Sequence, residues 1–216
     1  MTNDGAKPPL PDGRARNPRY KGKPPENPAE QKRTLQQIIR ELPGTDEWAK
    51  LDTEIEKSSD RSAAILMASQ LERFLEFAII AHLQTVDDDT HEALIGREGP
   101  LSTFYAKVHL GYAMGLFDSK VRDDLNTIRK VRNVFGHAVL SVGFSVTEIA
   151  DECASLQTAA IELTDEDKYE RMNLLGISIS RMRYMSAGNF IAIELLKITK
   201  ERAERRLLAR ALSPGP

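Results

Sequence analysis

One segment constrains the fold of this chain more than any other: residues 59–83, SDRSAAILMASQLERFLEFAIIAHL, are apolar around most of the circumference of a helix. A helix that is hydrophobic on nearly all sides must be surrounded by other elements, because water would otherwise contact its apolar side chains. We therefore expect this helix at the centre of a bundle. Strand-like alternation of apolar and polar residues is hard to find elsewhere, so the sequence predicts an all-α, multi-helix bundle.

The other predicted helices follow one another along the chain, and several begin at a capping residue. Asp118 is a predicted N-cap, and Ser145 with Glu148 fits an S-x-x-E capping box. The acidic run Asp87 to Asp89 opens a short helix. The predicted helices cover residues 28–42, 45–59, 59–83, 87 to about 96, 101–117, 119–139, 147–163 and 164–211, the last with a break or bend expected near Gly176 and Gly188.

Residues 1–28 differ in composition from the rest of the chain, because they hold seven of the eleven prolines and Tyr20 as their only aromatic residue. Such a segment buries too little apolar surface to order itself, so we predict a disordered, Pro-rich, basic arm followed by one all-helical domain over 29–212. The arm is either a solvated tail or a segment that touches phosphate groups or a partner. The cations available for such contacts are Arg14, Arg16, Arg19, Lys21 and Lys23.

The composition also restricts compartment and chemistry. No apolar run approaches the ~20 residues that a membrane span needs, and the N-terminal sequence lacks the apolar core of a secretory signal. Cys153 is the only cysteine, so neither an internal disulfide nor a Cys-rich metal site can form. We therefore expect a cytoplasmic protein without membrane contact, metal or cofactor. The net charge of −2 excludes a generally basic protein that coats nucleic acid but permits local basic patches.

The stretch IRKVRNVFGH, residues 128–137, places an arginine in the middle of an apolar stripe. A guanidinium directed into packing needs an acidic or carbonyl partner, because an unpaired buried charge costs on the order of several kcal/mol. Glu72 and Glu76, four residues apart on the central helix, are the expected partners of Arg132. The apolar residues that share the face of Arg132 at about 100° per residue are Val121, Leu125, Ile128, Phe135 and Val139.

Two interpretations of Arg132 follow. In the first it forms a structural ion pair that holds two helices together. In the second it faces a groove or a dimer seam, where His137 of the same or a second subunit acts with it. His137 lies about 140° around an ideal helix from Arg132, so the two side chains do not share a face.

Residues Arg132 to His137 have the R-N-x-x-x-H form found in HEPN (higher eukaryotes and prokaryotes nucleotide-binding) domains, which are helical bundles. The longer context resembles the mannitol operon repressor (MltR-like) family. This resemblance covers residues 58–196, and Gly136 departs from it, since alanine is commoner before the histidine. Its sequence blocks are SDRSAAILMASQLERFLEFAI, GPLSTFYAKVHLGYAMGLFD, DLNTIRKVRNVFGHA and, more loosely, RYMSAGNFIAIELL.

The resemblance to the repressor family implies an all-helical, non-catalytic regulator that acts in transcriptional regulation through protein contacts. On this hypothesis the groove near Asn133 and His137 serves recognition. The HEPN-like motif implies the alternative, a metal-independent RNA endonuclease. In that enzyme His137 would take the proton of a ribose 2′-hydroxyl, Arg132 would stabilise charge on the phosphate and Asn133 would orient a neighbour, across a dimer.

The expected partners follow from the same features. The apolar helices predict a homodimer, and the regulatory interpretation predicts a protein partner. Nucleic acid is a further candidate, RNA more than DNA, because no exposed base-reading helix is evident. The basic C-terminal residues Arg202, Arg205 and Arg206 are either a solvated helix end or a surface for phosphate groups or a partner.

Overall fold

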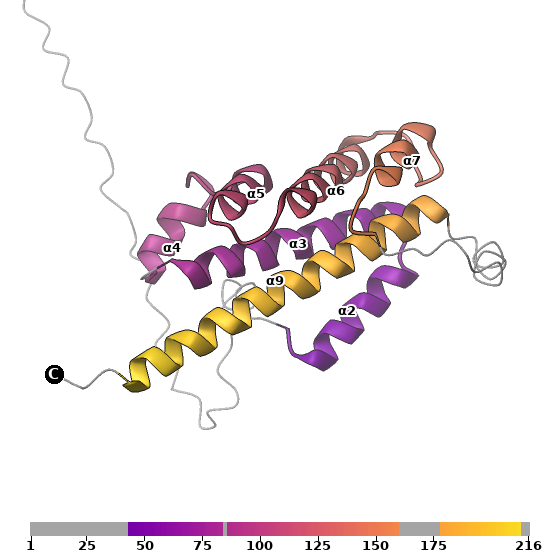
Figure 1. Cartoon of the computed structure of the whole chain (residues 1–216). Helices are drawn as coiled ribbons and strands as arrows, with labels where there is room; N and C mark the ends of the chain where they lie inside the picture. Colours follow the sequence, from indigo (N-terminus) through magenta and orange to yellow (C-terminus); the bar gives the residue numbers. More distant parts are fainter. Residues whose placement is uncertain (1–42, 84–85, 160–177, 213–216) are drawn as a thin grey trace, which may run out of the picture. The chain divides into compact units, whose positions relative to one another are not determined.

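The computed structural model describes residues 43–83, 86–159 and 178–212. The chain separates into two compact units, residues 1–44 and residues 45–216, and all the described helices belong to the second. Every regular element in the described ranges is a helix, which confirms the all-α prediction. The helices are α2 (Thr45–Lys57), α3 (Asp60–His82), α4 (Asp88–Ile95), α5 (Phe104–Ala113), α6 (Ser119–His137), α7 (Thr147–Ala154) and α9 (Ile179–Leu212) (Figure 1).

Parts of the predictions fall outside these ranges. The basic arm over 1–28 and the helix over 28–42 lie outside the described residues. The single domain predicted over 29–212 therefore stays a prediction. None of the described helices combines the length and the apolar character needed to cross a membrane.

Helix α3 lies at the centre of the second unit, as its apolar circumference predicts. It packs against α2, α5, α6 and α9, and Figure 1 shows it running beside the long α9. Ser59 begins α3 as its N-cap, with the hydroxyl accepting a hydrogen bond from the backbone N–H of Ser62. Its buried apolar residues are Ala63, Ala64, Met67, Ala68, Leu71, Phe74, Leu75, Ala78 and Ile79.

Three aromatic rings join α6 and α9 to this centre. The centroids of Phe135 and Phe144 are 4.9 Å apart, and those of Phe144 and Tyr184 are 5.2 Å apart. The Tyr184 hydroxyl donates to the carbonyl oxygen of Ala64 on α3 at 2.9 Å, with the carbonyl of Ile128 on α6 at 3.4 Å. Burial raises the pKa of Tyr184, so its hydroxyl stays protonated as a donor. The Tyr184 ring of α9 therefore contacts both α3 and α6 through its hydroxyl.

Helix α9 runs without interruption through Gly188, so a break expected there is wrong. A Cβ atom added at Gly188 would lie 2.4 Å from the sulfur of Met67, which is fully buried on α3. The glycine thus serves the close approach of α9 to α3. Gly176, the other expected bend, lies outside the described residues.

Two predictions at the end of α6 are wrong. The helix ends at His137, so Val139 does not lie on the buried face and is 98% exposed. Helix α7 begins after Val146 without any side-chain cap, so Ser145 and Glu148 form no capping box. Asp118 is the N-cap of α6, as predicted, and accepts from the Val121 backbone N–H.

Helix α7 ends at Ala154, well before the predicted residue 163. Asp124 of α6 gives the physical reason, because its carboxylate is 1% exposed and accepts from the backbone N–H groups of Gln157 and Thr158. The backbone N–H groups of Gln157 and Thr158 therefore bond to Asp124 and not to the carbonyl oxygens that a longer α7 would offer them.

The close contact of α9 with α3 gives a stability prediction. Gly188→Leu is expected to lower the free energy of unfolding by about 2 kcal/mol or more, because the added atoms overlap Met67 in a packed interior. Gly136→Leu is the matched control: it is the same change within a helix, at an exposed glycine with no atom within 4 Å of an added Cβ. Urea denaturation would measure both, and an equal effect of the two changes would contradict this account.

Candidate functional site

Two carboxylates of α3 form the centre of a buried ionic network. Glu72 and Glu76 are four residues apart and so project from one face of the helix. The Glu76 side chain is 3% exposed and that of Glu72 is 20% exposed. The ammonium nitrogen of Lys107 on α5 lies 3.0 Å from Glu72 Oε1 and 3.0 Å from Glu76 Oε2. With its side chain 6% exposed, Lys107 is a buried cation that bridges two acids.

Further groups complete this network on both sides. Arg73 donates from Nη1 to Glu76 Oε1, and His91 Nε2 of α4 lies 3.5 Å from the same oxygen. Arg132 Nη2 of α6 lies 3.3 Å from Glu72 Oε2. Two carboxylates are thus matched by three permanent cations, Lys107, Arg73 and Arg132. We call these residues, with His91, the α3 ionic network, which connects α3 with α4, α5 and α6.

The structure brings Arg132 to only one of its two expected partners. It is paired with Glu72, and its Nη1 also donates to Asn133 Oδ1 at 3.2 Å. Glu76 is occupied by Lys107 and Arg73 instead. The Arg132 side chain remains 32% exposed, so it lies at the edge of the network.

Sequence reasoning missed Lys107, although the same signal marks it. Lys107 interrupts the apolar stretch FYAKVHLGY just as Arg132 interrupts its own stripe. A lysine flanked by the buried Phe104 and Val108 must also find an acid. Applied to every helix, this rule predicts both cations of Glu72.

His137 lies apart from this network. It is exposed at the last position of α6, and among the described residues no hydrogen bond or ion pair joins it to Arg132. The arginine and histidine of the R-N-x-x-x-H stretch therefore do not share a site within one chain. The surface around His137 is partly apolar. We name it the α6 end surface and define it by Asn133, Val134, His137, Val139 and Leu140.

The loop that carries Val139 and Leu140 is held firmly at its backbone. Arg61 Nη2 of α3 donates to the carbonyl oxygens of Ala138 and Leu140, each at 2.9 Å. The backbone N–H of Phe144 donates to Asp60 Oδ2 at 3.0 Å. These long-range contacts fix the loop without burying its two aliphatic side chains, which are 98% and 79% exposed.

A second set of contacts fixes Asp60 itself. Arg181 of α9 pairs with Asp60 Oδ1 at 2.8 Å and donates to the carbonyl oxygens at the end of α2. A guanidinium that satisfies terminal helix carbonyls both caps α2 and orders the start of α3. Asp60, which holds the loop after α6, is therefore itself held by α9 through Arg181.

The remaining candidate cations fall into three groups. Arg206 donates to the carbonyl oxygen of Leu83 at the end of α3. Arg202 and Arg205 line a cavity at the same end of α3, together with His82. The arm residues Arg14, Arg16, Arg19, Lys21 and Lys23 lie outside the described residues. In the described ranges no group of three or more His, Cys, Asp or Glu side chains is arranged to hold a metal ion.

The fold and site define an all-helical bundle that is organised around a buried ionic network and exposes an apolar end of α6. A solved structure with a similar fold is that of YggD, described as a possible transcriptional regulator, from Shigella flexneri 2a str. 2457T. It is 16% identical, with a TM-score of 0.51 over 69% of this chain and 96% of that chain. MtlR in the MtlR–HPr complex from Escherichia coli is 15% identical, with a TM-score of 0.49 over 77% and 99% of the two chains. No protein-family model and no curated protein matches the chain.

The α3 ionic network gives a ranked stability prediction. Lys107→Met is expected to lower the free energy of unfolding by about 3–5 kcal/mol, because it leaves two neighbouring carboxylates without their shared cation. Arg132→Ala, at the partly exposed edge, should cost about 1–2 kcal/mol.

Lys130→Met is the matched control for Lys107→Met. Lys130 is 58% exposed and lies 3.5 Å from Glu152, a surface pair worth at most about 1 kcal/mol. Thermal and urea unfolding of the three variants would give the ranking, and a Lys107→Met protein as stable as Lys130→Met would contradict the network's structural role.

Proposed function

We propose that this protein is a non-catalytic regulator that acts in transcriptional regulation through protein contacts, with the α6 end surface as its recognition site. One observation carries the proposal: the loop after α6 is tied to Arg61 through two carbonyl oxygens yet leaves Val139 and Leu140 in water. Exposed single aliphatic residues are common, but Val139 and Leu140 are adjacent in sequence on a loop whose backbone is held to α3, and Val134 near the end of α6 is exposed as well.

The patch is suited to a protein partner because of how aliphatic side chains gain energy. Full burial of a valine or leucine side chain is worth about 1.5–3 kcal/mol, and only an apolar surface can supply that burial. The backbone beneath the patch is already ordered by Arg61 and Asp60, so binding does not have to order it. Burial of these side chains by a partner therefore costs less ordering free energy than it would on a mobile loop.

The rim of the patch indicates the charge of the partner. Lys130 and His137 lie about one helical turn before and after Asn133, on the same side of α6. Lys130 is more than half exposed, so its 3.5 Å pair with Glu152 can be exchanged for another acid. We infer a partner that presents apolar residues bordered by carboxylates, with the complementary charges guiding encounter.

The likeness to YggD bears on this proposal through the fold alone. YggD is described as a possible transcriptional regulator, and the proposal gives this chain the same kind of role. The resemblance of residues 58–196 to the mannitol operon repressor family points the same way. The predicted cytoplasmic setting and the predicted homodimer belong to the proposal as well.

The decisive test uses a variant that removes the patch but keeps the loop. Val139→Ser with Leu140→Ser leaves the carbonyl oxygens that Arg61 holds, so the folded structure should be retained. In cells that lack the gene, transcript profiles would be compared after complementation with the parent, this double variant and Ile193→Ser. Ile193, 57% exposed on α9, is the control for loss of an exposed aliphatic residue elsewhere.

The proposal predicts that the parent and Ile193→Ser restore the profile and that the double variant does not. Any partner found would then be purified and titrated calorimetrically. Its Kd should weaken about tenfold or more for the double variant and change little for Ile193→Ser. Full complementation by a folded double variant would refute the assigned surface.

The alternative of a metal-independent RNA endonuclease rests on Arg132 and His137, both reachable by a second copy because neither is buried. Purified parent and His137→Ala would be incubated with single-stranded and structured RNA in the presence of a metal chelator. The regulatory proposal predicts no cleavage by either protein. Cleavage by the parent that is lost in folded His137→Ala would replace the proposal with the ribonuclease.

A further inference from the structure

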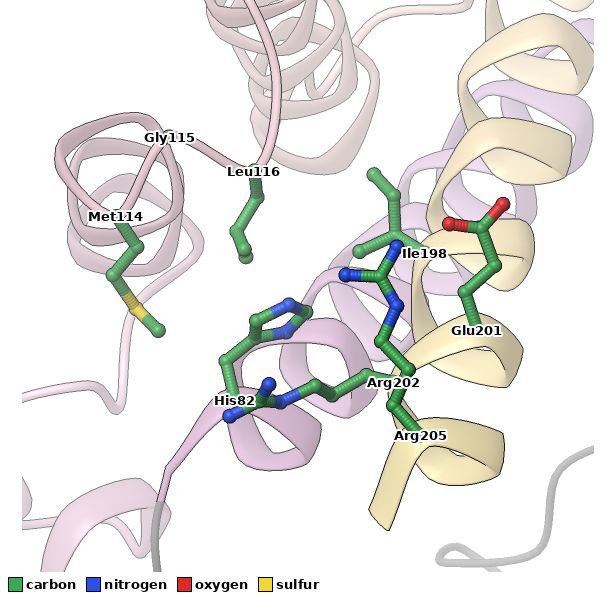
Figure 2. Close-up of a pocket in the computed structure, with 8 residues that line it drawn as sticks. All are labelled: His82, Met114, Gly115, Leu116, Ile198, Glu201, Arg202 and Arg205. Carbon is green, nitrogen blue, oxygen red and sulfur yellow. The ribbon is translucent and has the colours of Figure 1, made fainter. Parts of the chain in front are cut away.

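A cavity of about 230 Å³ lies at the C-terminal end of α3 (Figure 2). His82 is the last residue of α3, whereas Arg61, which anchors the α6 end surface, is near its start. Twenty-one residues of helix separate them, which is about 30 Å at 1.5 Å per residue. The two places are thus independent features of the same bundle.

The charged groups of this cavity come from one face of α9. Arg202 and Arg205 are three residues apart and therefore neighbours on the helix surface. Figure 2 shows their side chains on the same side of the cavity as His82, with Met114 and Leu116 opposite. Glu201 is the only acid among the lining residues, so two permanent positive charges face one negative charge.

The two arginines are not engaged by the described protein. Among the described residues no ion pair is made by Arg202 or Arg205, and Arg202 Nε is buried without a hydrogen-bond partner. The next arginine, Arg206, is different because it donates to the carbonyl oxygen of Leu83. A buried guanidinium N–H without a partner costs free energy, and an anion in the cavity would satisfy it.

His82 adds an imidazole ring, one nitrogen of which is already hydrogen-bonded within α3. Its Nδ1 lies 2.8 Å from the carbonyl oxygen of Ala78, which fixes Nδ1 as the donor. The other nitrogen, Nε2, is left for the cavity. A neutral ring can accept there from a protonated phosphate oxygen, and a protonated ring can donate to an anionic one.

The remaining wall is apolar and comes from Met114, Leu116 and Ile198. A site with paired cations on one side and aliphatic side chains on the other suits an anionic head group attached to a small organic body. Guanidinium groups match phosphate oxygens in pairs. A cavity of about 230 Å³ has room for one phosphate group with a small organic body.

We propose that the cavity formed by His82, Arg202 and Arg205 is a binding site for the phosphate group of a small phosphorylated molecule. The site is separate from the proposed recognition surface and does not depend on it. The same phosphate chemistry could be presented by a nucleic-acid backbone, so the test contains an arm for each source.

The experiment uses the full chain and isothermal titration calorimetry with inorganic phosphate, glycerol 3-phosphate and a single-stranded oligonucleotide. Glycerol and sodium chloride at equal ionic strength are the blanks. The variants are Arg202→Gln, Arg205→Gln and Lys200→Gln. Lys200 is exposed on the same helix and is not among the lining residues, so it is the control for loss of one positive charge.

The proposal predicts saturable binding of one phosphate or glycerol 3-phosphate per chain. Affinity should fall about tenfold or more in either arginine variant and less than about threefold in Lys200→Gln. Arg205 is exposed, so its variant should fold even if Arg202→Gln does not, and circular dichroism would check both.

Three results would overturn the proposal. The first is no saturable binding of either small phosphate by the folded parent. The second is an equal loss in Lys200→Gln and the arginine variants, which would indicate diffuse attraction of anions to the basic end of α9. Binding of the oligonucleotide alone would likewise reject a small phosphorylated ligand and assign the cations to a nucleic-acid backbone.

Discussion

The burial of two carboxylates one helical turn apart on α3 is the constraint on which the rest of the bundle depends. The side chains of Glu76 and Glu72 are 3% and 20% exposed, so water cannot solvate their charges fully. Each uncompensated buried charge costs on the order of several kcal/mol, which is a large part of the net free energy of unfolding of a typical folded domain. Lys107 must therefore come from α5 and Arg132 from α6. This charge matching ties α4, α5 and α6 to one turn of α3.

The same constraint separates the two ends of the R-N-x-x-x-H stretch. Arg132 is held toward α3 by Glu72, while His137 lies at the exposed end of the helix. One helix thereby contributes to stability through one residue and to an exposed surface through another. The loop after α6 continues this division, because Arg61 and Asp60 bind its backbone and leave its aliphatic side chains in water. In the proposed function, this fixed loop is what presents the α6 end surface to a partner.

Sequence patterns predict the elements of this fold well and their contacts less well. The apolar circumference of residues 59–83 and the cap at Asp118 are local signals, and both are confirmed. The capping box at Ser145 fails because the N-cap of α7 is Val146, one residue later than the sequence pattern places it. Gly188 looks like a helix bend in sequence but serves a close approach to Met67, which only packing reveals.

The candidate site shows the same limit. The need of Arg132 for an acid can be read from its own helix, and Glu72 is one of two acids at suitable spacing. Which acid it meets becomes apparent only when the helices are packed, where Lys107 and Arg73 both contact Glu76 and Arg132 contacts Glu72. The cavity of Arg202 and Arg205 is similar, since its basic residues are evident in the sequence but its convergence with His82 is not.

A double-mutant cycle would measure how strongly the pairing of Arg132 with Glu72 stabilises the bundle. The free energy of unfolding would be measured for the parent, Glu72→Gln, Arg132→Gln and the double variant. The account predicts a favourable coupling of about 1 kcal/mol or more between the two side chains, as expected for a partly buried pair. A coupling near zero, with all four proteins folded, would show that Arg132 is not held by Glu72 and would contradict its structural role.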